Sequence, residues 1–374
     1  MTIRPPLAIL LLLQACLLFS ALDLLPAWGD EAFTLRTVAH PVREIIPIVQ
    51  HDIHPPLYYV LARQWRRLPL PWSGVAALRS FSALWALAAT VLLDLFWTRF
   101  WAPSGRRLAL WLFVLSPCFL LYGRMARSYS MQVALVLLTL GLLQRWMKRP
   151  NSWALGGGAA VAMLALLYTH YVPGIALMAG VMAVAWRSLG PMRVAAFWLA
   201  SAAGYAPWAI SLMDAMNRWG QAGSFSSSYA STGSVLREQV LKAAYGAISL
   251  TIGETFLVVS LLVVPVVLFV AATRAKGLLH QPLAGILPIA AGVGYLGVAR
   301  WVSYPFIPAR MLWLLPFLML ALALGLPASR GWHCGEARWQ LFWLLSSHRT
   351  FCTFAARTFS IPAIRRRCAK SPLR

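Results

Sequence analysis

Long apolar runs are the feature of this sequence that most limits how the chain can fold. Several of them approach the roughly 20 residues that an α-helix needs to cross the hydrocarbon core of a bilayer. Hydrophobic residues make up 60% of the chain and charged residues only 11%, which leaves too little polar surface to cover a soluble globule of 374 residues. We therefore expect an all-α polytopic membrane protein.

The runs predict about ten transmembrane helices within a single domain, residues 1–327. The first run follows the basic Arg4 and could be a signal peptide, but its apolar core is long and no small-x-small cleavage site follows, so we expect an uncleaved span. The predicted spans are residues 7–25, 76–98, 108–122, 129–146, 153–169, 172–186, 194–213, 254–273, 283–299 and 309–327.

Loop charges predict the orientation, because cationic loops stay on the cytoplasmic side. With the N-terminus inside, every inner loop is basic, from Arg99 to Lys276. The outer side then receives two long segments, residues 26–75 and 214–252. We expect the first of them to contain short interfacial helices and the protein to lie in an inner membrane.

The net charge of +23 would favour nucleic-acid binding in a soluble protein. Here the inner loops and residues 328–374 carry many of the cations and would place them against anionic membrane lipids, so no nucleic-acid partner is predicted. Residues 328–374 contain nine Lys or Arg and one acid. We interpret them as a basic, poorly ordered cytoplasmic tail, or as a segment that is not natively selected.

Acidic residues are scarce, and five of the ten lie between residues 23 and 52. Asp30 and Glu31 follow the first span and place two carboxylates at the membrane–water boundary. A carboxylate there could accept a proton from a hydroxyl nucleophile. Alternatively, Asp30 could be the N-cap of a helix that begins at Glu31. The spacing leaves both interpretations open.

A second cluster, His51-Asp52-Ile53-His54-Pro55-Pro56-Leu57-Tyr58-Tyr59, lies in the same predicted loop. His54 precedes a proline and should be extended, and Pro56 can occupy the first turn of a following helix. The His and Asp side chains could bind a divalent metal, but their spacing is not that of a known zinc site, and interfacial His and Tyr are common anchors. No cofactor or metal site is predicted, although a divalent metal remains possible.

Outward-facing arginines form a third cluster. Arg124 and Arg127 are three residues apart, so on a helical turn they would share a face and could bind a phosphate. Snorkelling toward lipid headgroups is the alternative. Arg310 follows two prolines near the outer end of the last span and could face the same pocket.

The order of these clusters resembles the integral-membrane glycosyltransferases of the GT-C type, in the group of the protein O-mannosyltransferases and the lipid A aminoarabinose transferase (the dolichyl-phosphate-mannose mannosyltransferase superfamily). The resemblance covers residues 5–327 and rests on seven short motifs in order. They are Gly29-Asp30-Glu31-Ala32-Phe33, His54-Pro55-Pro56-Leu57-Tyr58-Tyr59, Ala77-Leu78-Arg79, Arg124-Met125-Ala126-Arg127-Ser128-Tyr129-Ser130, Tyr168-Thr169-His170-Tyr171, Tyr205-Ala206-Pro207-Trp208 and Pro308-Ala309-Arg310-Met311-Leu312.

The resemblance implies transfer of a sugar, with inversion, from a polyprenyl-phosphate donor to a glycolipid, polysaccharide or protein acceptor on the periplasmic side of a bacterial inner membrane. It implies that Asp30 is the general base and that Glu31 supports it. The implied ligands of the donor phosphate are Arg124, Arg127 and Arg310, and the implied pocket residues are His54, Tyr58, Tyr59, Arg79, Tyr129 and His170. Met125 and Met311 depart from the family pattern, which often has Glu and Tyr there.

Two other functional classes are compatible with the sequence. A secondary transporter should have ionisable groups at the bilayer midplane, yet only Asp94 and Glu254 come near a span, both close to its end. A non-catalytic assembly subunit is the second alternative. The sequence identifies neither the sugar nor the acceptor.

Overall fold

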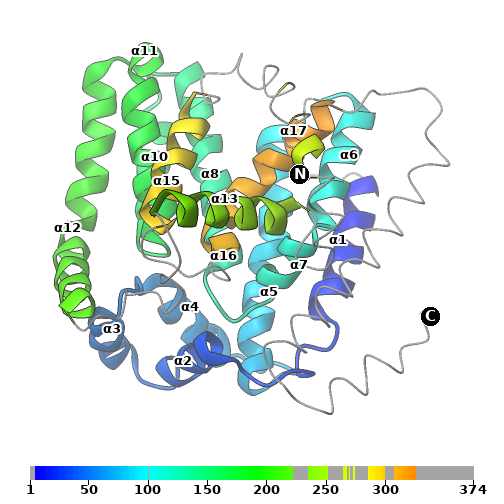
Figure 1. The fold of residues 1–374 in the computed structure, drawn as a ribbon, viewed down its shortest axis with the longest axis vertical. Helices are drawn as coiled ribbons and strands as arrows, with labels where there is room; N and C mark the ends of the chain where they lie inside the picture. Colours follow the sequence, from blue (N-terminus) through cyan, green and yellow to red (C-terminus); the bar gives the residue numbers. More distant parts are fainter. Residues whose placement is uncertain are drawn as a thin grey trace.

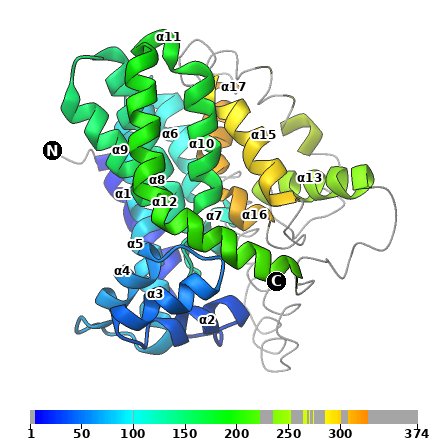
Figure 2. The ribbon, with the colours of Figure 1, turned by 90° about the vertical axis from the view of Figure 1, so that its left-hand side faces the viewer.

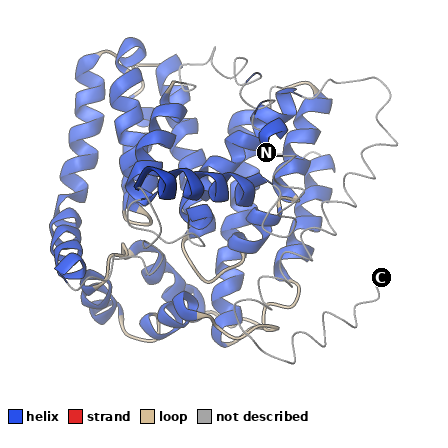
Figure 3. Cartoon of the chain, in the orientation of Figure 1, coloured by secondary structure: helices blue, strands red, loops and turns tan. Residues whose placement is uncertain are grey.

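The computed structural model describes residues 5–99, 101–221, 235–251, 264–267, 269, 273, 285–299 and 307–325. Most of the predicted span 254–273 and the whole tail, 328–374, lie outside the described residues. Every regular element within the described ranges is helical, and no strand occurs in them (Figure 3). This confirms the all-α prediction.

The helices form a bundle with three short helices at one end (Figures 1 and 2). Their bounds are α1 Pro5–Phe19, α2 Gly29–Thr37, α3 Val42–His51, α4 Leu57–Arg66, α5 Gly74–Leu93, α6 Pro103–Val114, α7 Pro117–Gly123, α8 Tyr129–Lys148, α9 Trp153–Leu167, α10 Tyr171–Val184, α11 Trp186–Leu189, α12 Pro191–Gln221, α13 Val235–Thr251, α15 Ile286–Ala299, α16 Ile307–Met311 and α17 Leu315–Gly325. A π-turn, Asp94–Thr98, extends α5, and a 3-10 turn, Leu312–Leu314, joins α16 to α17.

Helix α8 lies in the core of the bundle, between α5 and α9. Gly141 on α8 allows the close approach to the end of α5, because a Cβ atom there would lie 2.2 Å from the Phe96 ring. Gly180 on α10 has the same role, since its Cβ would lie 2.7 Å from Ile286 of α15. Small residues at such contacts are the usual means of close helix packing within membranes.

Three of the described helical segments are long and apolar enough to cross a membrane: Gly74–Thr98, Tyr129–Lys148 and Ile307–Leu324. A fourth results if α6 and α7, which are bent by 52° at their junction, are one span. Four more apolar helices are shorter than a full span. These helices are those of a membrane-embedded protein, but the predicted number of about ten spans is not confirmed.

Two predicted spans are broken for identifiable reasons. The apolar run 7–25 is helical only as far as Phe19, and the chain then enters a turn that contains Ala21, whose φ is +50°. The run 108–122 contains two helices, because the side chain of Ser116 caps α7 by accepting from the Phe119 N–H, and Pro117 begins it. Neither break in the helix could be predicted from hydropathy, because mostly apolar residues lie on both sides of each break.

The predicted first loop contains the short helices α2, α3 and α4, at the end of the bundle opposite α11 (Figures 1 and 2). Pro56 is the N-cap of α4, one position before the predicted first turn. The Leu57 N–H donates to the Tyr168 carbonyl at 3.0 Å, which ties α4 to the turn between α9 and α10. The loop helices thereby lie against the turns that join the longer helices.

Candidate active site

Asp30 lies in the first turn of α2, with a side chain that is 33% exposed. The helix begins at Gly29 with Trp28 as its N-cap, so the prediction that Asp30 caps a helix starting at Glu31 is wrong. Within the described residues no donor hydrogen-bonds to its carboxylate. Its Oδ2 atom lies 3.7 Å from Nη2 of Arg127.

Arg127 is buried in the turn between α7 and α8. Its guanidinium donates to the Tyr59 hydroxyl at 2.9 Å and to Nε2 of His54 at 2.6 Å, and lies 3.4 Å from Oγ1 of Thr34 and from the Asp30 carbonyl oxygen. Arg127 thus joins α2, α4 and the residues that precede α4 in a single cluster.

The contact with Arg127 determines the protonation of His54. A guanidinium has no acceptor, so Nε2 must be the unprotonated nitrogen and Nδ1 carries the hydrogen. Nδ1 lies 3.3 Å from Oδ2 of Asp52. Burial, reinforced by the Arg127 charge, lowers the pKa of His54. His54 is therefore a neutral acceptor that orients Arg127.

His170 and Arg310 come from two further elements, the turn before α10 and the helix α16. Burial and the charge of Arg310 hold the pKa of His170 well below its usual range. Nδ1 of His170 and Nη1 of Arg310 are buried and have no hydrogen-bond partner among the described residues. Gln132 of α8 donates to the Ala309 carbonyl at 2.7 Å and so fixes the backbone next to Arg310.

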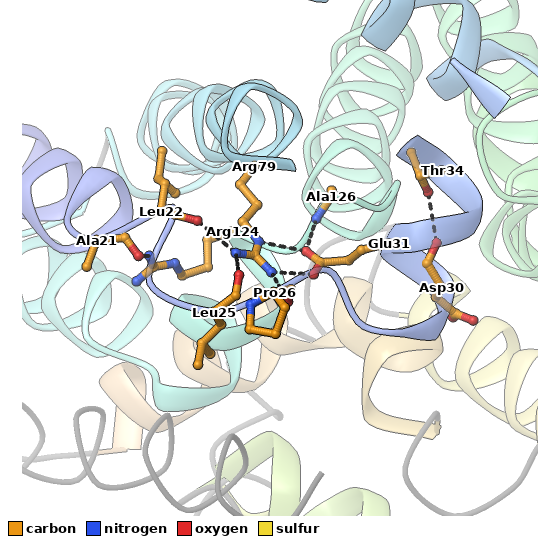
Figure 4. A network of polar contacts seen from close by, with 10 residues as sticks. All are labelled: Ala21, Leu22, Leu25, Pro26, Asp30, Glu31, Thr34, Arg79, Arg124 and Ala126. Carbon is orange, nitrogen blue, oxygen red and sulfur yellow. Dashed lines mark hydrogen bonds and ion pairs between the residues drawn. The ribbon is translucent and has the colours of Figure 1, made fainter. Parts of the chain in front are cut away.

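Two predicted site residues, Glu31 and Arg79, bind each other (Figure 4). Nε and Nη2 of Arg79 donate to the Glu31 carboxylate at 2.9 and 2.5 Å. Glu31 is only 1% exposed and also accepts from the Ala126 N–H at 2.8 Å. The remaining donors of Arg79 bind main-chain carbonyl groups between α1 and α2. Glu31 and Arg79 thus form a network with the chain between α1 and α2 and with the turn before α8.

Arg124 and Arg127 do not share a face. Residues 124–128 form a turn and not a helix. Two residues three positions apart in this turn therefore do not lie on one helical face. Nη2 of Arg124 donates to the carbonyl oxygen of Ser20 at 2.6 Å. It also donates to that of Ala21 at 3.0 Å (Figure 4). The structure places Arg124 at the end of α1, and only Arg127 beside Asp30.

The two consecutive tyrosines face different surroundings. The Tyr58 hydroxyl is 2.8 Å from Oγ of Ser82 on α5, whereas the Tyr59 hydroxyl accepts from Arg127. Burial raises the pKa of Tyr59 to about 12. Tyr129 is buried at the start of α8, with its ring edge-on to Tyr122.

No family model and no curated protein matches this sequence. The structure is similar to that of the archaeal oligosaccharyltransferase AglB from Archaeoglobus fulgidus, solved with an inhibitory peptide and a dolichol-phosphate, with a TM-score of 0.50 and 14% identity. The apo form of the Archaeoglobus fulgidus oligosaccharyltransferase gives a TM-score of 0.50 and 13% identity. Each match covers 94% of this chain and 55% of the other, so the chain spans about half their length.

The chain has a GT-C type fold. In this GT-C fold the candidate site is formed by elements that are far apart in the sequence, from α2 to α16. At these identities the likeness shows the fold alone.

The sequence singled out Asp52 only as a possible metal ligand and Asp94 only as an acid near the end of a span. Gln132 was not singled out, and nothing in the sequence pairs it with the backbone of α16. Asp94 accepts from Arg106 at 2.6 and 2.7 Å, near the end of α5 away from α2. Glu254, the other acid near a predicted span, lies outside the described residues. Within the described part of the chain no three His, Cys, Asp or Glu side chains gather as a metal site would require.

Proposed function

We propose that this protein is a glycosyltransferase that takes a sugar from a polyprenyl-phosphate donor. It transfers the sugar, with inversion, to an envelope glycolipid, a polysaccharide or a protein on the periplasmic side of a bacterial inner membrane. The GT-C type fold supports this proposal, and AglB was solved with a dolichol-phosphate and a peptide, which is consistent with a lipid-linked donor and a protein acceptor.

One juxtaposition carries the proposal: the partly exposed Asp30 carboxylate lies 3.7 Å from the buried Arg127 guanidinium. Asp30 can meet an incoming acceptor, because no described residue donates to its carboxylate. Arg310 has a buried Nη1 atom without a described partner. A buried cationic donor is stabilised best by an anionic oxygen, and a phosphate supplies several.

The proposed reaction is a single displacement. The acceptor hydroxyl or amine attacks the anomeric carbon from the face opposite the bond to the phosphate oxygen, and Asp30 takes the proton that the acceptor loses. The bond between the anomeric carbon and that oxygen breaks, and its electron pair leaves with the polyprenyl phosphate. Arg310 stabilises the charge that develops on the phosphate. Arg127 and His54 hold the surroundings of Asp30 fixed.

Transfer from radiolabelled polyprenyl-phosphate sugars, in membranes with matched amounts of inserted protein, tests the proposal. Asp30→Asn should lower the rate by about 10²–10⁴-fold, the typical contribution of a positioned general base. Asp23→Asn is the matched control, because Asp23 is an exposed acid between α1 and α2, and it should transfer at the wild-type rate.

Unchanged transfer by Asp30→Asn would remove Asp30 from the mechanism. Absence of transfer from every donor would contradict the glycosyltransferase proposal, and solute uptake by vesicles containing the protein would then favour a transporter.

A further inference from the structure

Two arginines hold the chain between α1 and α2. Arg79 donates to the carbonyl oxygens of Leu22 and Leu25 at 2.7 Å and of Pro26 at 3.1 Å. Arg124 holds the two carbonyls just before them. Because α1 ends at Phe19, these carbonyl groups lie outside its helical hydrogen bonds, and unpaired carbonyl groups are costly near a bilayer. The Ala21 carbonyl also accepts from the Leu24 N–H at 3.2 Å.

Glu31 connects this network to the helix that carries Asp30. Its carboxylate binds Arg79 of α5 and the Ala126 N–H of the turn before α8, so the first turn of α2 is attached to both elements. Figure 4 shows Glu31 directed toward Arg79 and Asp30 directed away from it. The two neighbouring carboxylates therefore have opposite environments, 33% exposed for Asp30 and 1% for Glu31.

We infer that Glu31 and Arg79 are positioning residues, which hold α2 so that the Asp30 carboxylate faces the acceptor and Arg127. This inference rests on the proposed function for its catalytic part. All five N–H donors of Arg79 are used within the chain, so none is left for a donor phosphate. The Glu31 carboxylate accepts three hydrogen bonds and is closed to substrate.

A double-mutant cycle tests this inference. It compares the activities of the wild type, Arg79→Met, Glu31→Gln and the double variant. Arg79→Met leaves the Glu31 carboxylate buried without its counter-ion, which is strongly destabilising. The variant should lose about 100-fold in kcat, the loss typical of a misplacement of about 1 Å, with the donor KM nearly unchanged. Glu31→Gln should lose less, because its amide oxygen still accepts from Ala126.

The double variant Glu31→Gln/Arg79→Met should be more active than Arg79→Met alone, since no unpaired carboxylate remains. If Glu31 took the acceptor proton or touched the substrate, adding Glu31→Gln would lower the activity further, and that result would overturn the inference. Glu44→Gln, an exposed acid on α3, is the matched control and should keep wild-type kcat.

Thermal unfolding of the detergent-purified variants separates failure of this inference from failure of the proposed function. Even if no sugar is transferred, the double variant should melt above Arg79→Met, and an equal or reversed order would overturn the positioning role. If Arg79→Met does not fold, Arg79→Lys replaces it in the cycle. This variant keeps a cation beside Glu31 with three donors instead of five, and should show a smaller loss in melting temperature.

Discussion

Arg310 differs from the other arginines of the site in how its donors are used. The guanidinium groups of Arg79, Arg124 and Arg127 bind carbonyl oxygens or side chains of the chain itself. Arg310 has a buried nitrogen with no partner among the described residues, although Gln132 fixes the backbone beside it. At the scale of single residues, this difference makes Arg310 the principal candidate for the donor phosphate.

We predict that Arg310→Met raises the donor KM by about 10- to 100-fold, the equivalent of one charge-assisted hydrogen bond of about 1.5–3 kcal/mol. Initial rates over a range of donor concentrations measure this change. Arg36→Met, an exposed arginine on α2, should leave the KM unchanged. A wild-type KM in Arg310→Met would mean that the phosphate binds elsewhere.

In the short helix α4, two consecutive residues have different roles: one packs the helix against α5 and the next contacts the candidate active site. Tyr58 and Tyr59 are both buried, but one hydroxyl meets Ser82 on α5 and the other meets Arg127. Their rings pack edge-on at 5.8 Å, so movement of one displaces the other. At the scale of the element, α4 uses one side chain for anchoring and the next for the site.

We predict that Tyr58→Phe lowers stability by about 0.5–1.5 kcal/mol, the net contribution of one hydrogen bond, and that kcat changes little. The Ser82 hydroxyl loses this partner but still donates to the Arg127 carbonyl at 3.2 Å. Tyr59→Phe removes an acceptor of Arg127 and should lower kcat more than Tyr58→Phe does. Thermal melting and steady-state rates on the two purified variants make the comparison. Equal effects on kcat would contradict the division of roles.

At the scale of the whole molecule, two of the described histidines, His54 and His170, lie between elements that are distant in sequence, His54 partly buried and His170 buried. Burial, together with Arg127 for His54 and Arg310 for His170, lowers both pKa values from the usual value near 6.5. Below about pH 6.5 the unfolded chain binds protons that the folded chain does not. Stability should therefore fall as the pH drops below about 6.5 and be independent of these groups above it.

Melting temperatures between about pH 5 and 8 test this prediction, in the range where an unfolded histidine titrates. The slope below about pH 6.5 should be smaller in His170→Gln, whereas His51→Gln, at an exposed histidine, should keep it. A melting temperature that rises on acidification would contradict the prediction.

The sequence predicted the all-α class and the short helices of the first loop. The family resemblance assigned Asp30, His54 and Arg127 to one site; the structure brings them together, and their roles stay predictions. Sequence reasoning was wrong about the helical face shared by Arg124 and Arg127 and about Asp30 as an N-cap. It also did not foresee that Glu31 and Arg79 bind each other. The roles of these two residues depend on which elements surround them and not on spacing along the chain.

The sequence by itself determined that the protein is embedded in lipid and that its secondary structure is helical. The reason is that the apolar content and the length of the apolar runs fix how much surface must avoid water. The sequence also limited the candidate acids to a few, since the chain has ten. Only the tertiary structure decided which carboxylate is exposed, which guanidinium retains a buried donor without a partner, and where an apolar run stops being helical. Those properties depend on neighbours that the fold brings together from α1, α2, α5 and α16. The distances between such neighbours cannot be read from their positions along the chain.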